Sequence, residues 1–181
     1  SDQNGYTDLT TWILGMDVNM GGLYLGGAFK DVDVTIGGPG KESRRAWRAA
    51  ASYSAPFGLT VGGLFQMFHD PNSNANDWKI FGGGASMKVG NGVIKTQYYR
   101  ADSMGDTNTT GGTLAAAGYD HNLSKNTMVY AVYGAVRNQS VGAFTIISAG
   151  HSNPNDVGGQ FPVGGAGGHD NALSVGMKVK F

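Results

Sequence analysis

The chain of 181 residues contains no cysteine, only five prolines and few charges. The absence of cysteine excludes disulfides, thiol catalysis and zinc–thiolate sites. Charged residues make up 14% of the chain, against roughly 25% in soluble domains, and their formal charges sum to zero. We therefore expect no nucleic-acid partner. One uncharged stretch, 49–68, has the length of a membrane helix, but Pro56 and three glycines interrupt it and its apolar residues follow period two, which excludes a helix.

Glycine is abundant instead. The chain has 31 glycines, more than double the roughly 7% of average usage, and this disfavours long helices. Hydrophobic residues reach 40% while the mean hydropathy is −0.21. The last eleven residues, 171–181, alternate: Leu173, Val175, Met177 and Val179 fall on one face, together with the terminal Phe181. A strand of about ten residues, apolar outward and polar inward, is the repeating unit of a transmembrane β-barrel.

Period-two alternation and turn residues predict nine strands and no helix, at 9–19, 23–30, 44–54, 57–68, 79–89, 93–100, 113–121, 127–137 and 171–181. The predicted connections alternate between short turns and long polar loops at 31–43, 69–77, 101–112 and 138–170. Short turns at one end and long loops at the other are typical of outer-membrane barrels. The pattern therefore predicts an all-β, antiparallel transmembrane β-barrel.

Many cations lie within these predicted strands, on the side away from the apolar residues. A lysine or arginine facing lipid near the middle of the membrane costs about 2–4 kcal/mol, so we expect such cations to line the lumen. The alternative is the wet face of a soluble sheet. The predicted pore-lining residues are Arg44, Arg48, Lys30, Lys95, Arg137 and Lys178.

Aromatic residues gather near the predicted strand ends, as in the two interfacial belts of membrane proteins. The predicted belt residues are Trp12, Trp47, Tyr53, Phe57, Tyr119, Tyr130 and Phe181, with Trp78 also placed near the long loops.

The number of predicted strands is odd. A closed antiparallel barrel with nine strands would need one parallel seam, so residues 1–181 are expected to form the C-terminal portion of a single, larger barrel domain. If one strand is misassigned, a complete eight-stranded barrel with a filled interior becomes possible.

Several segments carry a family resemblance: 51–59, 94–102, 118–127, and Tyr130–Tyr133 followed by a long loop and a closing strand. In order and spacing they resemble the C-terminal half of a Gram-negative general porin of the trimeric, sixteen-stranded kind. The resemblance implies a passive channel for small hydrophilic solutes in the bacterial outer membrane, with seven strands upstream. It also implies a homotrimer, contact with outer-membrane lipid and lipopolysaccharide, and a C-terminal strand that the barrel assembly machinery reads. The acidic constriction loop of that family has no counterpart here, and Arg44 and Arg48 are the best candidates for its basic ladder.

Signals for catalysis are poor, and neither an enzyme nor a cofactor is expected. His151 and His169 share one loop with Asp156 and Asp170, but such residues are more often solvated than metal ligands. The leading hypothesis is a diffusion channel whose lumen cations favour anions. One alternative is a small closed barrel that acts as a structural or adhesive surface protein and presents residues 138–170. The other is a soluble, glycine-rich β-sandwich that binds a ligand through its loops.

Overall fold

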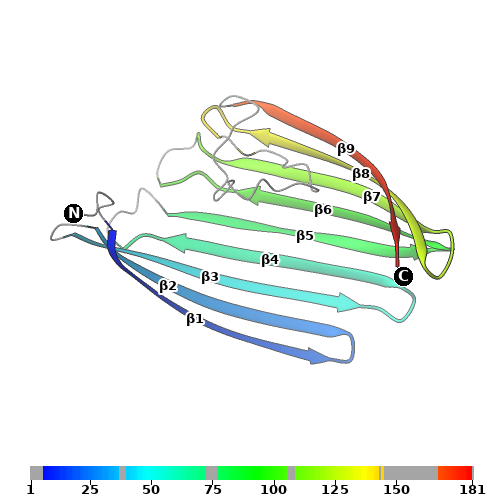
Figure 1. Cartoon of the computed structure of the whole chain (residues 1–181), viewed down its shortest axis with the longest axis horizontal. Helices are drawn as coiled ribbons and strands as arrows, with labels where there is room; N and C mark the ends of the chain where they lie inside the picture. The colour runs from blue at the N-terminus through cyan, green and yellow to red at the C-terminus, as the bar shows by residue number, and fades with distance from the viewer. Residues whose placement is uncertain are drawn as a thin grey trace.

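The computed structural model describes residues 6–36, 40–71, 77–105, 109–142, 144 and 167–180. These residues form one antiparallel sheet in which each strand pairs with the next along the chain (Figure 1). Its nine strands are β1 (Tyr6–Met20), β2 (Leu23–Ile36), β3 (Gly40–Ser54), β4 (Leu59–His69), β5 (Trp78–Val89), β6 (Gly92–Ala101), β7 (Gly112–Asn122), β8 (Thr127–Asn138) and β9 (His169–Val179). The predicted all-β, antiparallel fold and its nine strands are confirmed. In the described part of the chain, no helix is long and apolar enough to cross a membrane.

The connections at one end of the sheet are short turns, and those at the other end include the long loops (Figure 1). Between β3 and β4 the turn occupies residues 55–58, so Phe57 lies in the turn and not in the strand as predicted. Gly58 has φ +91° there, a left-handed conformation that glycine adopts without strain. Both β1 and β9 run from the long-loop end towards the short-turn end.

The predicted long loop 31–43 is wrong. The ladder between β2 and β3 continues to the pair of Ile36 with Gly40, so only residues 37–39 lie between the strands. The β-branched residues after Asp31 favour extended backbone. An ion pair across the ladder, with Arg45 Nε 3.4 Å from Asp31 Oδ2, also suits neighbouring strands. Charge in this segment was mistaken for a loop signal.

The register assigns every strand residue to one of two faces, because directly opposed residues of antiparallel strands point the same way. One face carries an apolar band across all nine strands. Its members include Leu14, Met16, Leu25, Phe29, Trp47, Val61, Phe65, Phe81, Met87, Ile94, Tyr98, Tyr119, Tyr133, Leu173, Val175 and Met177. The other face carries Asp17, Lys30, Arg44, Arg48, Gln66, Lys88, Lys95, Gln97, Asp120, Ser174 and Lys178.

Burial distinguishes the two faces. Along β4, β7 and β8 the residues of the apolar band are mostly exposed and those between them are mostly half-buried. Val136 and Gln66, both on the polar side, are 2% and 8% exposed, whereas Leu173 and Val175 are 71% exposed. Side chains converge on the inside of a curved sheet and diverge on its outside. We therefore call the polar side the concave face and the apolar side the convex face.

No second sheet covers the convex face within the described residues. In that same part of the chain, Val136 is the single apolar side chain that is buried, and a soluble domain of this size would bury many more. The β-sandwich hypothesis is therefore wrong. The nine observed strands also remove the basis for a complete eight-stranded barrel.

The apolar band is nearly as tall as the roughly 25 Å apolar band of outer-membrane barrels. On β4 it runs from Leu59 to Met67, about 27 Å along the strand at 3.4 Å per residue, or about 20 Å once a barrel strand's tilt is included. At the long-loop end the convex face carries basic residues, with Arg45, His69, Lys79 and Arg100 on β3 to β6 and Arg137 on β8. The transition suits the boundary between hydrocarbon and headgroups.

Candidate functional site

Three cations lie close together on the concave face of β2 and β3. Lys30 is directly opposite Ala46, and Arg44 and Arg48 lie two residues away from Ala46 on either side. Residues two apart on a strand share a face and lie about 7 Å apart. We call Lys30, Arg44 and Arg48 the basic patch, and its members were all predicted to line the lumen.

Arg48 is held in place by a neighbour on β4. Its Nε donates a 2.8 Å hydrogen bond to Oε1 of Gln66, which is almost fully buried. A bond from a charged donor is among the stronger hydrogen bonds in proteins, and it fixes the plane of the guanidinium. The remaining N–H groups of Arg48 stay on the concave face.

The other predicted pore cations differ in their surroundings. Lys95 lies on the concave face of β6, where its Nζ donates to Oδ2 of Asp120, so its charge is locally balanced. Lys178 lies on the concave face opposite Met128, near the short turns.

Arg137 is not where the sequence pattern put it. The register sets it opposite Thr113 and His169, on the face that carries Leu173. It therefore belongs to the charged row at the long-loop end of the convex face, and its assignment to the lumen is corrected.

Most of the predicted belt aromatics are exposed. Trp12, Trp47, Tyr53 and Tyr119 lie on the convex face, and Phe57 lies in a short turn. Tyr130 lies on the concave face instead, opposite Gly176. Phe181 lies outside the described residues.

Trp78 also differs from its predicted place in the belt. It opposes Phe68 across β4 and β5 on the concave face, and the two rings stack with centroids 4.5 Å apart and planes 9° apart. The ring of Phe144, beyond β8, lies 6.4 Å from that of Trp78. The sequence pattern did not predict the stacked pair of Phe68 and Trp78, because the two residues are brought together by the pairing of β4 with β5.

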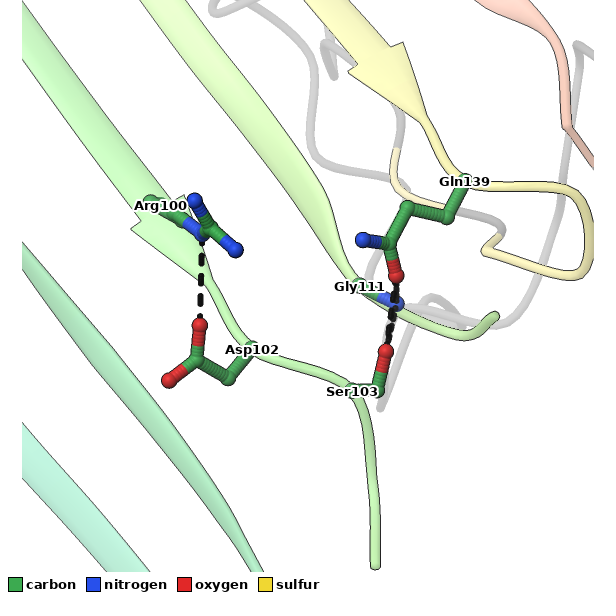
Figure 2. A network of polar contacts seen from close by, with 5 residues as sticks. All are labelled: Arg100, Asp102, Ser103, Gly111 and Gln139. Atoms are coloured by element: carbon green, nitrogen blue, oxygen red, sulfur yellow. Dashed lines mark hydrogen bonds and ion pairs between the residues drawn. The ribbon is translucent and has the colours of Figure 1, made fainter. Parts of the chain in front are cut away.

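The loops at the end of the sheet are bonded to one another (Figure 2). Ser103 Oγ donates to Gln139 Oε1 at 2.7 Å, and the Gly111 N–H approaches both oxygens, at 3.2 and 2.9 Å. Arg100 pairs with Asp102 at 3.2 Å beside them. The segments after β6 and after β8 are thereby fastened together across the start of β7.

A second fastening joins the end of β4 to the start of β5. The His69 ring lies 2.8 Å from Asp77 Oδ2, and the Asp70 backbone N–H donates to Asp77 Oδ1 at 2.8 Å. Burial by itself would raise the pKa of the Asp77 carboxyl. The two hydrogen bonds and the charge of His69 outweigh burial, so this pKa lies below its ordinary value of 3.8.

Among the residues that the structure describes, no three acidic or histidine side chains gather as a metal site. His151 and Asp156, considered above as ligands, lie outside those residues.

One curved antiparallel sheet with a convex apolar band and a concave polar wall defines part of a transmembrane β-barrel. The sequence profile of Gram-negative porins matches residues 1–140, and the chain belongs to that family. Family membership locates the protein in the bacterial outer membrane.

One solved structure similar to this chain is the anion-selective porin from Comamonas acidovorans, with a TM-score of 0.70 and 22% sequence identity. The alignment covers 92% of this chain and 48% of that porin, so the chain spans about half the length of its structural relative. At this identity the likeness shows the fold. No curated protein sequence matches the chain.

Proposed function

We propose that the protein is a passive outer-membrane diffusion channel for small hydrophilic solutes and ions, with a preference for anions. The observation that carries the proposal is the division of the sheet into a convex apolar band and a concave wall with the basic patch. A wall of this kind excludes lipid on one side and holds water on the other. Conduction through it involves no catalytic step and no cofactor.

Strand direction supports a barrel larger than this chain. β1 and β9 run the same way, so pairing them directly would create a parallel seam. Antiparallel closure instead takes an odd number of further strands. We infer that an upstream portion of the same protein supplies them, seven in a sixteen-stranded barrel of the general porin type, together with the constriction loop.

Anion preference follows from the charges of the concave face. Among the concave-face strand residues whose side chains the structure describes, cations outnumber carboxylates: Lys30, Arg44, Arg48, Lys88, Lys95 and Lys178 stand against Asp17, Asp120 and Asp170. A unit charge about 5 Å from a passing ion changes its energy by about 0.8 kcal/mol in water, or about fourfold in local anion concentration. The basic patch therefore lowers the barrier for anions in the adjacent lumen. The structural relative is named as anion-selective, which agrees with this reading.

The test is ion selectivity of the intact protein in planar bilayers at low salt. Arg44→Ala with Arg48→Ala is expected to lower the anion-to-cation permeability ratio by at least about fourfold and to move the reversal potential towards cations. Arg137→Ala is the control, because it removes one arginine charge from the convex face. An unchanged reversal potential in the double variant, or an equal shift in Arg137→Ala, would reject this assignment.

The family also supports an assembly. We propose a homotrimer that contacts outer-membrane lipid and lipopolysaccharide through exposed convex faces and that is inserted through recognition of its C-terminal strand. Heat-modifiable migration of the intact protein as a trimer in SDS gels is the expected result, and migration as a monomer without heating would contradict it.

A further inference from the structure

The concave face has a hollow beside the basic patch. Lys30, Ala46, Phe68 and Trp78 form one row across β2 to β5, each directly opposite the next. Ala46 is the smallest side chain of the row, and the space above it belongs to a pocket of about 480 Å³. Lys30, Arg44, Ala46, Phe68, Asp70 and Trp78 are among the residues that line this pocket.

One wall of the hollow is flat and aromatic. The stacked rings of Phe68 and Trp78 stand on the concave face, which also carries the basic patch. The ring of Phe144, from the loop after β8, also lies near Trp78, with the ring centroids 6.4 Å apart. Aromatic rings on a surface that faces water favour contact with another flat apolar group.

The opposite wall is cationic. Lys30 is one strand away from Ala46, and Arg44 is two residues along β3, so both ammonium and guanidinium groups reach over the hollow. Asp70 follows the end of β4 and contributes a carboxylate to the pocket on its long-loop side. Its charge disfavours an anionic group there and leaves the side of Lys30 as the favourable place for one. Arg45 and His69 also line the pocket, although the register places both residues on the convex face.

We propose that this hollow, which we call the aryl-anion site, binds flat aromatic carboxylates. The ring lies against the stacked pair of Phe68 and Trp78, and the carboxylate lies over Ala46 towards Lys30. The inference rests on the proposed channel function and adds a substrate class to it. Binding is weak enough for release, as conduction requires, so residence at the site slows smaller anions without stopping them.

The experiment uses the intact protein in planar bilayers, with chloride current as the signal. Benzoate is titrated against cyclohexanecarboxylate, which has the same charge and a similar size but no aromatic face. Benzoate is expected to reduce the chloride current at lower concentration than cyclohexanecarboxylate. Equal inhibition by the two anions would overturn the aryl-anion site.

Substitutions in the hollow test whether benzoate contacts its aromatic wall. The benzoate concentration that halves the chloride current is measured for each variant against that variant's own uninhibited current. Trp78→Leu is expected to raise this concentration about fivefold to tenfold above the wild-type value. Trp47→Leu, the same change on the convex face, is expected to match the wild type. Ala46→Leu fills the hollow while both aromatic residues are retained, and it is expected to weaken benzoate inhibition as well. Wild-type inhibition in both Trp78→Leu and Ala46→Leu would refute the proposal, whereas absence of any chloride current in the wild-type protein would refute the channel itself.

Discussion

The assignment of the convex face to lipid can be tested at two adjacent alanines on β7, which is paired on both sides. Ala117 lies on the convex face between Thr96 and Tyr133, in the middle of the apolar band. Ala116 lies on the concave face between Gln97 and Gly134. Ala117→Arg and Ala116→Arg introduce the same side chain at the same depth and differ only in the face that receives it.

The expected penalties differ because the two faces meet different solvents. An arginine at the hydrocarbon midplane of a barrel costs about 2–4 kcal/mol, which Ala117→Arg should show in full. This is a roughly 30- to 700-fold change in the folding equilibrium. At position 116 the guanidinium meets lumen water, can bond to Gln97 and has space above Gly134. Ala116→Arg should therefore cost less than about 1 kcal/mol.

Reversible unfolding of the intact protein in phospholipid vesicles, followed by tryptophan fluorescence in guanidinium chloride, measures both penalties. The slope with denaturant should be the same for both variants and the wild type, so that differences in midpoint report stability. Equal penalties at 116 and 117, or a larger one at 116, would refute the assignment of the faces and with it the proposed lumen.

Two further outcomes follow from particular contacts. A Cβ on Gly176 would lie 2.5 Å from the hydroxyl oxygen of Tyr130, so Gly176→Ala should push this ring into the lumen and lower single-channel conductance, and adding Tyr130→Ala should restore it. An unchanged conductance in Gly176→Ala would contradict the close approach. The pKa of Asp77 is lower in the folded protein than in the unfolded chain. Its contacts with His69 and Asp70 therefore contribute stability at pH values above the unfolded-state pKa, and this contribution is lost as the pH falls through the folded-state pKa. The amide resonance of Asp70 should therefore shift below about pH 4, and the shift should be smaller in Asp77→Asn; a shift of unchanged size in this variant would exclude Asp77 as its source.

The strands and turns could be predicted because their signals are local. Turn glycines and period-two alternation act within a few residues, and they located all nine strands to within a few positions, apart from the long-loop ends of β2 and β3. Those ends were missed because charged residues such as Asp31 were read as loop. In a barrel the strands project beyond the apolar band, where charged pairs such as Asp31 with Arg45 lie outside the hydrocarbon.

The face of Arg137 could not be predicted from β8 alone. This strand has apolar residues on both sides, with Val132 and Val136 on one face and Val129 and Tyr133 on the other. Parity within the strand is then ambiguous, and the face is decided by the partner strand, where Leu173 and Met177 mark the apolar side. The same reasoning applies to Trp78, whose place on the concave wall depends on its pairing with Phe68.

The abundance of glycine acquires a specific meaning on the concave wall. Three tyrosine rings there lie over glycines: Tyr24 over Gly26, Tyr99 over Gly82 and Tyr130 over Gly176. A Cβ on Gly82 would lie 2.6 Å from Cδ1 of Tyr99, and one on Gly176 would lie 2.6 Å from Cζ of Tyr130. Any other residue would therefore displace the ring, and on the inside of a curved wall a displaced ring moves towards the lumen axis. These glycines allow large side chains to lie flat on the wall, so the composition that disfavours helices also keeps the lumen open.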